Sequence, residues 1–204
     1  MSRVGSDQVD EVGARLLRRW REPHRYYHDV THLAEVLAAV DTLCTAEDVG
    51  RDDHTVAVLA AWFHDAVYSA EQHETNEAES AALADAELAR LHVRGEIRSR
   101  VGELVLDTVA HDLSDEQARD AARTVLHDAD LWILAAPVAR FDEYCAQVRE
   151  EYAHVPVVAY AKGRGEVLRP FLVRDHVYRT RHAREAWEGM ARENLARELT
   201  RLAG

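Results

Sequence analysis

A histidine and an aspartate stand side by side at the end of a strongly apolar stretch, and this pair is the first candidate for chemistry. Residues 56–63 read VAVLAAWF, and His64 and Asp65 follow directly. A helix this apolar is expected in the core, where a charged group must be paired or bound to a metal ion. The pair is therefore a metal-ligand candidate. A second acid, Asp130, lies in a comparable setting in LHDADLWIL (126–134).

The His-Asp dipeptide alone carries little information, because a chain with 12 histidines among 204 residues and many aspartates produces such pairs by chance. Four pairs occur, and they begin at His28, His64, His111 and His127. Only the pair at His64 ends a fully apolar stretch, so its context singles it out.

Several blocks of sequence carry a resemblance to a known superfamily. His32 with Val36 four residues on, the pair in AAWFHDAVY (60–68) and the second acid of DADL (128–131) are similar to the H…HD…D signature of the HD-domain metal-dependent phosphohydrolases. The longer pattern resembles the family of predicted metal-dependent HD phosphohydrolases. Its further blocks are RYYHDVTHL (25–33), NEAESA (76–81), DTVAH (107–111), HDADLWIL (127–134), VREEY (148–152), GRGEVLRPFL (163–172) and ARENLAREL (191–199).

The resemblance implies a ligand set and a reaction. It implies that His32, His64, Asp65 and Asp130 hold one divalent metal ion. Two imidazoles with two carboxylates suit an octahedral Mn²⁺, Fe²⁺, Co²⁺, Ni²⁺ or Mg²⁺ with open water positions better than a closed tetrahedral Zn²⁺. Such an ion lowers the pKa of a bound water and polarises a phosphoryl oxygen. We therefore expect hydrolysis of a phosphate ester in a nucleotide or another small phosphorylated metabolite.

Two neighbouring residues compete with the implied ligands. Asp128 and Asp130 are two positions apart, about 200° around a helix, so their carboxylates point to different sides. The resemblance favours Asp130 and leaves Asp128 as a supporting or surface group. His28 and His32 are four apart and share a face if residues 27–33 are helical. The resemblance selects His32, and His28 is expected to support the site or contact the substrate.

A phosphate-binding site needs cations, and guanidinium forks suit phosphate oxygens. Arg25 lies just before the implied ligands, and Lys162 and Arg164 lie in a matching block. We expect Arg25 to orient the phosphate, with Lys162 or Arg164 assisting. His28 and His111 are further candidates for substrate contacts.

The general acid or base is less evident, because this chain departs from a pattern of related HD hydrolases. Several of those carry a Glu or Glu-Asp three or four residues after the HD pair, where this chain has Tyr68 and Ser69. The proton-transfer group is then expected to be Glu77 or Asp65 itself, and the substrate class of those relatives does not carry over.

The elements that must position these residues are helical. Apolar residues recur at helical spacing along the chain and alternating strand patterns are scarce, which predicts an all-α fold. We expect one HD-type helical domain over residues 1–204, with its core at about 25–135 and a C-terminal helical extension at about 137–203. Expected helices cover residues 7–20, 32–43, 52–68, 76–91, 93–110, 114–130, 137–152 and 180–202. Thr31 and Ser114 are the expected N-caps, and Gly163 and Gly165 are expected to interrupt residues 155–178.

Bulk composition limits the partners. A net charge of -12 argues against a nucleic-acid polymer, whereas a small phosphorylated ligand needs only a few local cations. No apolar run is long enough for a membrane span, and residues 1–7 lack an export signal. Cys44 and Cys145 have no metal-type spacing and are expected to be reduced thiols of a cytoplasmic protein.

Two other functions stay open from the sequence. A di-iron HD-type oxygenase would need further ligands for a second metal ion, and His28 and His111 are available for that role. A non-catalytic module, stabilised by its metal ion, could instead bind a nucleotide or a partner helix.

Overall fold

Helices supply the regular secondary structure of the computed structural model, which describes residues 5–71 and 73–204. The expected all-α fold is confirmed, and no strand occurs in these ranges. The α-helices are α1 (Ser6–Arg19), α2 (Val30–Ala46), α3 (Arg51–Phe63), α4 (Asn76–Arg90), α5 (Gly95–Asp107), α6 (Ala121–Asp130), α7 (Val138–Glu151), α8 (Val157–Val173), α9 (Arg181–Ala186) and α10 (Glu188–Ala203). Short 3₁₀ segments are η1 (His73–Thr75), η2 (Gln117–Arg119) and η3 (Leu131–Ala135).

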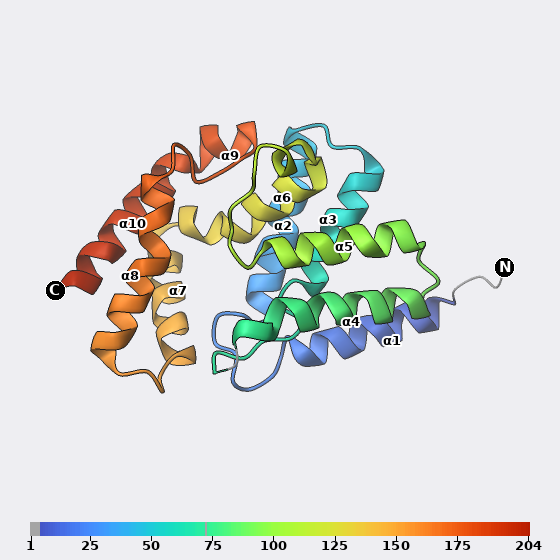
Figure 1. Cartoon of the computed structure of the whole chain (residues 1–204), viewed down its shortest axis with the longest axis horizontal. Helices are drawn as coiled ribbons and strands as arrows, with labels where there is room; N and C mark the ends of the chain where they lie inside the picture. Colours follow the sequence, from blue (N-terminus) through green and yellow to red (C-terminus); the bar gives the residue numbers. More distant parts are fainter. Residues whose placement is uncertain (1–4, 72) are drawn as a thin grey trace.

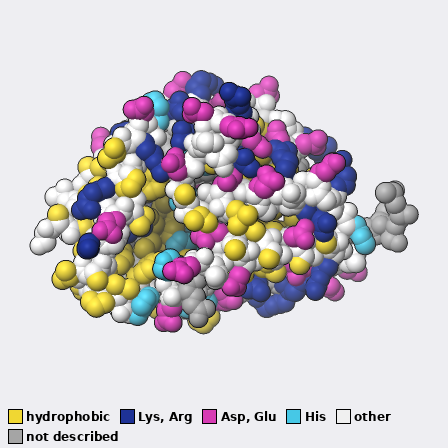
Figure 2. Space-filling model, viewed as in Figure 1, with side chains coloured by type: hydrophobic (Ala, Val, Ile, Leu, Met, Phe, Trp, Pro, Cys, Tyr) yellow, Lys and Arg dark blue, Asp and Glu magenta, His cyan; other side chains and the backbone are white. Residues whose placement is uncertain are grey.

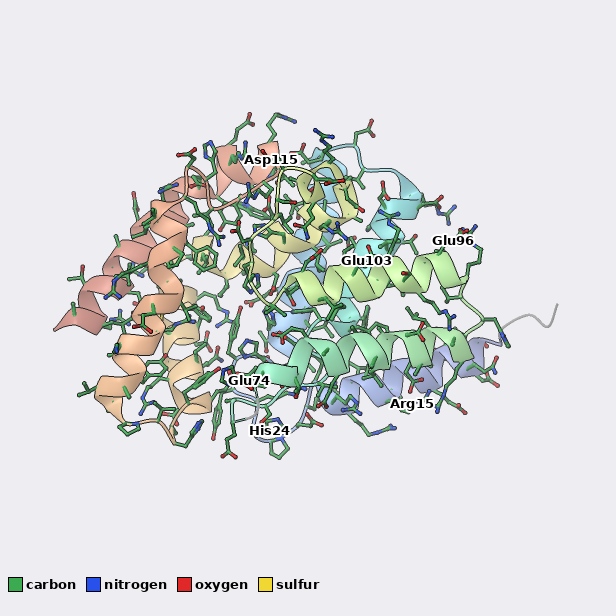
Figure 3. All side chains as sticks on the ribbon, in the orientation of Figure 1. Arg15, His24, Glu74, Glu96, Glu103 and Asp115 are labelled. Atoms are coloured by element: carbon green, nitrogen blue, oxygen red, sulfur yellow. The ribbon has the colours of Figure 1, made fainter. Side chains whose placement is uncertain are left out.

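The helices fall into two groups that share one hydrophobic core. Helices α2, α3 and α6 pack against one another, and α4 and α5 lie side by side with α5 against α3 (Figure 1). On the other side, α8 and α7 pack with α10, and η3 joins this group to the first. The core is continuous, because buried residues from α1 through α10 belong to one cluster. Arg15 of α1, which is labelled in Figure 3, forms a 2.6 Å ion pair with Glu87 and so ties α1 to α4.

Two aspartate caps decide where the ligand-bearing helices begin. The Asp29 carboxylate accepts hydrogen bonds from the backbone N–H of Thr31 (2.7 Å) and of His32 (3.3 Å), so α2 begins at Val30. The expected cap at Thr31 was therefore wrong by two residues. Asp120 caps α6 by accepting from the Arg123 N–H at 3.1 Å. Caps of this kind satisfy N–H groups that have no partner inside the helix.

The predicted capping box at Ser114 forms, but it starts a different element. Ser114 N–H donates to Gln117 Oε1 (3.0 Å), and the Gln117 N–H donates back to Ser114 Oγ (3.3 Å). The chain then makes only the short η2 turn before α6 begins at Ala121. Residues 114–120 thus form a connecting segment, and α6 is shorter than the sequence predicts.

Helix α3 ends at Phe63, five residues earlier than expected, and this ending places the His-Asp pair directly after the helix. Backbone groups beyond the helix find partners outside it. Ser80 of α4 accepts from the Val67 N–H at 3.0 Å and donates to the Val67 carbonyl at 3.2 Å. External hydrogen bonds therefore replace the next helical turn.

Residues 157–173 form a continuous helix, so the expected interruption at Gly163 and Gly165 was wrong. Glycine lowers helix propensity by about 1 kcal/mol relative to alanine, and burial of an apolar face outweighs such a cost. Leu168 and Phe171 provide that face, with 1% and 6% exposure.

The expected last helix is divided at Trp187 into α9 and α10. Glu188, at the start of α10, accepts from the Val177 N–H through both carboxylate oxygens, at 3.0 and 3.1 Å. The division lets the chain before α9 dock onto the first turn of α10.

Both cysteines are free and buried, as expected. Burial raises the pKa of the Cys44 thiol to about 11 and that of Cys145 to about 12. No helix among the described residues is both long and apolar enough for a membrane crossing. Residues 1–4, which belong to the segment expected to lack an export signal, lie outside the described residues.

Candidate metal centre and adjoining pocket

Three helix ends bring four potential ligands to one point. His32 lies in the first turn of α2, and His64 is the residue directly after α3, with Asp65 next to it. Asp130 is the last residue of α6. Both imidazoles are almost fully buried, whereas the side chains of Asp65 and Asp130 keep 15% and 9% exposure. The carboxylates therefore form the open side of the cluster.

The spacing of the donor atoms matches a single cation. The two Nε2 atoms of His32 and His64 are 3.1 Å apart. Asp130 Oδ1 lies 3.3 Å from His32 Nε2 and 3.5 Å from His64 Nε2, and Asp65 Oδ2 lies 3.7 and 3.2 Å from the same atoms. Ligands bound at about 2.1 Å are separated by about 3.0 Å in adjacent octahedral positions and by about 3.4 Å in a tetrahedron. The separations among His32, His64 and Asp130, 3.1–3.5 Å, are close to this range, and these three residues form one group of mutually close donors; Asp65 lies near both imidazoles.

Hydrogen bonding prepares His64 as a ligand. Its Nδ1 lies 2.8 Å from the Ala61 carbonyl oxygen, which can only accept, so Nδ1 carries the proton. In the neutral imidazole Nε2 then keeps its lone pair and faces the cluster. Trp20 packs against both imidazoles, with ring centroids 5.4 Å from His64 and 6.3 Å from His32. This apolar backing keeps water from the rear of the site.

The electrostatics of the cluster favour bound positive charge. Burial alone would lower the pKa of His64, but the carboxylates of Asp65 and Asp130 outweigh it and raise that pKa well above its usual value. Burial likewise opposes ionisation of both acids, yet the facing imidazoles hold the pKa of each well below its usual range. The ionised carboxylates are thus stable only with positive charge nearby. Protonated imidazoles supply this charge, and a divalent ion can supply it instead.

Arg25 is placed differently from the prediction. Its side chain is fully buried, and its NH1 donates to the carbonyls of His28 (3.0 Å) and Asp65 (2.7 Å) while NH2 donates to that of Ala66 (3.2 Å). Nε donates to Glu22 at 3.1 Å, and Arg25 is not among the residues that line the adjoining pocket. The guanidinium therefore clamps the backbone around the His-Asp pair. This position contradicts the expectation that Arg25 contacts phosphate.

His28 lies beside the site in a fixed orientation. Its Nδ1 is 2.7 Å from Glu151 Oε2, and its ring stacks on Tyr68 at 4.1 Å between centroids. Glu151 also accepts from the Tyr68 hydroxyl at 2.8 Å and from three consecutive backbone N–H groups, those of residues 26–28. Sequence reasoning missed Glu151, whose signal was an acid on the buried face of α7. Its contacts leave His28 Nε2 directed away from Glu151.

His111 is held at the edge of the cluster by its backbone. Its carbonyl accepts from Arg174 NH1 and lies 3.2 Å from His127 Nε2, and its φ of 42° is in the left-handed region. The side-chain Nδ1 lies 3.7 Å from Asp130 Oδ2 and has no hydrogen-bond partner within the described ranges. Burial lowers the pKa of His111, which favours the neutral imidazole.

The remaining predicted substrate residues separate into pocket and surface. Glu77 lines the pocket, and burial, with a smaller contribution from Asp65, raises its pKa. Arg164 also lines the pocket and donates through NH2 to the Tyr144 hydroxyl. Lys162 does not line it, and its side chain is 79% exposed near Glu166. The expected contribution of Lys162 to phosphate binding is therefore not supported by its position.

Of the two roles expected for Asp128, a supporting or a surface group, its burial excludes the surface one. Asp128 is fully buried and accepts from the backbone N–H groups of Arg179 (2.8 Å) and Thr180 (2.7 Å) and from the Thr180 hydroxyl (2.7 Å). His127 Nδ1 lies 2.8 Å from Asp128 Oδ1. Asp128 therefore fixes the segment before α9 to α6.

The cluster opens into a pocket of about 620 Å³ between the two groups of helices. Figure 2 shows a hollow in this region, with hydrophobic side chains around it and histidine and acidic side chains at its edge. The polar end includes Asp65, Asp130 and His28, and the other end is formed by α7 and α8. A volume of this size accommodates a small organic ligand.

Comparisons with family models, curated proteins and solved structures found no match to this chain. Functional inference therefore rests on the geometry of the cluster and of the pocket.

Proposed function

We propose that this protein is a metal-dependent phosphohydrolase of the HD superfamily, which hydrolyses a nucleotide or another small phosphate ester. The observation that carries the proposal is a group of donors at the end of a pocket: the Nε2 atoms of His32 and His64 lie 3.1 Å apart, and a carboxylate oxygen of Asp65 and one of Asp130 each lie 3.2–3.7 Å from both of them. The sequence resemblance to HD phosphohydrolases agrees with this donor set.

His32, His64, Asp65 and Asp130 would hold one divalent ion, and Mn²⁺, Fe²⁺, Co²⁺, Ni²⁺ and Mg²⁺ all accept such mixed nitrogen and oxygen ligands. When bound, such an ion acidifies a coordinated water and polarises a phosphoryl oxygen. The partial exposure of the two carboxylates leaves room for water and phosphate on the pocket side of the cluster.

The pocket residues then bind the ester and move protons. His28, fixed by Glu151 and Tyr68, would donate a hydrogen bond from Nε2–H to a phosphate oxygen. Glu77 has a pKa raised by burial, which suits a carboxyl that passes a proton to the leaving oxygen. Arg25 acts through the backbone, because its donors hold the carbonyls next to Asp65.

The test combines metal content with turnover. The double variant His64→Ala/Asp65→Ala should lose bound metal in elemental analysis, and it should lose phosphate release in a screen of nucleotides, cyclic nucleotides and sugar phosphates with several divalent metals. A matched control is His176→Ala/Asp115→Asn, which removes the same side-chain types from exposed positions. Turnover retained by the first variant would refute the proposal, as would equal loss in the control.

A dinuclear oxygenase is the second candidate, and one observation favours it. His111 Nδ1 is buried without a hydrogen-bond partner within the described ranges, and it faces the second oxygen of Asp130 at 3.7 Å. A carboxylate shared between two ions would have this arrangement, with His28 as a further ligand. Two iron ions per chain together with oxygen consumption would support this alternative, whereas one ion per chain with phosphate release would exclude it.

A non-catalytic role for the metal predicts a closed ligand shell. The carboxylates of Asp65 and Asp130 instead border a pocket large enough for a ligand, which favours the enzymatic proposal. Binding of phosphate esters without turnover in the presence of any of these metals would support the non-catalytic module instead.

A further inference from the structure

The pocket has two chemically different ends. Its metal-binding end carries carboxylates and histidines, whereas its far end is a wall built by α7 and α8. On α8 the pocket-lining residues Ala159, Gly163, Val167 and Phe171 are spaced four apart. One face of the helix therefore borders the pocket along its length. If the reacting group of a substrate is bound at the metal-binding end, the rest of that substrate therefore lies against this wall.

Most side chains of the wall are aromatic or apolar, and Arg164 is its charged residue. Tyr144 of α7 packs edge-on against Tyr27 at 4.5 Å between centroids, and Tyr27 lies 4.6 Å from the ring of His32. The Arg164 guanidinium lies over Tyr144 at 5.1 Å, which adds another flat surface. Flat aromatic and guanidinium surfaces favour stacking with a planar ligand.

Charge limits the number of phosphates. Four acids line the pocket, namely Asp65, Glu74, Glu77 and Asp130, and Arg164 is the one Arg or Lys among its described lining residues. Glu74 lies in η1, just before α4, on the side toward α7 (Figure 3). A divalent ion and Arg164 supply three positive charges against four carboxylates, so each phosphate group adds further negative charge and a single phosphate is favoured over a triphosphate.

We propose that the substrate is a phosphate monoester whose alcohol part is a flat, apolar group of one or two fused rings, which packs against the α7–α8 wall. This inference rests on the proposed hydrolase function. In the reaction, water adds to phosphorus while the bond between phosphorus and the alcohol oxygen breaks. The alcohol leaves with one proton from the water, and hydrogen phosphate is the second product.

Gly163 offers a way to fill the wall without disturbing the fold. It lines the pocket, and a Cβ added there meets no atom within 4 Å. In Gly163→Leu the new side chain occupies the space of the ring, and leucine is a better helix former than glycine. Gly189→Leu is the matched control, because Gly189 is an exposed glycine of α10 with no atom within 4 Å of its added Cβ.

The assay compares (2-naphthyl)methyl phosphate with ethyl phosphate on metal-loaded protein. Both esters release a primary alcohol, so the leaving groups differ little. We expect kcat/KM to favour the naphthyl ester by about 100-fold in the wild type and in Gly189→Leu, and by tenfold or less in Gly163→Leu. Equal kcat/KM for the two esters in the wild type, or an unchanged preference in Gly163→Leu, would overturn the inference and leave hydrolysis intact.

A binding measurement separates this inference from the proposed function. The non-hydrolysable (2-naphthyl)methyl phosphonate should bind with a change in naphthyl fluorescence, and Gly163→Leu should weaken binding at least about tenfold. Binding with this loss, but no turnover of either ester, would refute the hydrolase and retain the pocket assignment. Failure of the phosphonate to bind the wild type would overturn the assignment.

Discussion

Glu151→Gln is the perturbation for which the structure gives the clearest magnitude. The side chain of Glu151 is fully buried, and its carboxylate accepts from three backbone N–H groups, the Tyr68 hydroxyl and His28. Burial alone would raise its pKa, but these donors outweigh burial and lower the pKa from the usual 4.5 to about 2. The glutamine amide keeps one oxygen for the N–H groups and turns an NH₂ toward groups that had been donors.

The depressed pKa fixes both the size and the pH dependence of the effect. A group whose pKa falls on folding stabilises the folded state above its unfolded pKa, and this stability is lost as the pH falls toward the folded pKa. For Glu151 the contribution is about 3.4 kcal/mol at pH 7 and about 2.0 kcal/mol at pH 3.5. Since the amide is uncharged at both pH values, the loss in Glu151→Gln should be about 1.4 kcal/mol larger at pH 7.

The assay is urea unfolding of both proteins, with a chelator present, at pH 7 and pH 3.5. Any steric effect of the amide is the same at both pH values and cancels in the comparison. Glu150→Gln is the control, because Glu150 is the exposed neighbour of Glu151 on α7, and its change should stay within about 0.5 kcal/mol. Equal destabilisation of Glu151→Gln at both pH values would show that the carboxylate is not held as a charge.

Three further outcomes follow from contacts elsewhere. Arg25→Lys should lower the affinity for a divalent ion by roughly 10- to 100-fold in titration calorimetry, because a single ammonium nitrogen lacks the planar fork by which NH1 and NH2 of Arg25 reach three separate carbonyls; unchanged affinity would contradict the clamp. Asn194→Ala should cost about 2–3 kcal/mol in urea unfolding, because the buried Nδ2 donates to the carbonyls of Leu134 and Ala136, both at 2.9 Å, and a loss below 1 kcal/mol would argue against that role. Mn²⁺ at a hundred times its Kd should raise the Tm by about 5–10 °C in calorimetry, and His64→Ala should abolish the rise; the same rise in the variant would place the ion elsewhere.

The sequence was most informative where the chemistry and the apolar pattern coincided. An apolar stretch that ends in His64 and Asp65 has few explanations, and the structure places His64 beside His32 and Asp130 and Asp65 beside both imidazoles. The angle of about 200° between positions two apart on a helix correctly predicted that Asp128 and Asp130 point to different sides. It could not show what Asp128 does, because its partners are the backbone N–H groups of Arg179 and Thr180, about fifty positions away. Hydrogen bonds to a distant backbone leave no local pattern.

Arg25 and α8 show two other limits of sequence reasoning. An arginine next to acidic ligands has the same sequence signature whether it contacts phosphate or carbonyl oxygens, and only the packing around Arg25 distinguishes the two. The glycines of α8 lower its intrinsic helix propensity, but the face that carries Leu168 and Phe171 is buried against the rest of the core. Tertiary packing therefore decided both cases.

The convergence of three helix ends has a consequence for how the candidate centre would gain and lose a metal ion. His32 and Asp130 come from α2 and α6, so the whole of α3, α4 and α5 intervenes between them along the chain. No short fragment contains every donor, and closing so long a loop is slow and entropically costly. Capture of the ion must then be a late event in folding, and partial unfolding of any of the three helices would release it. Occupancy of the centre would thereby report the integrity of the entire helical core.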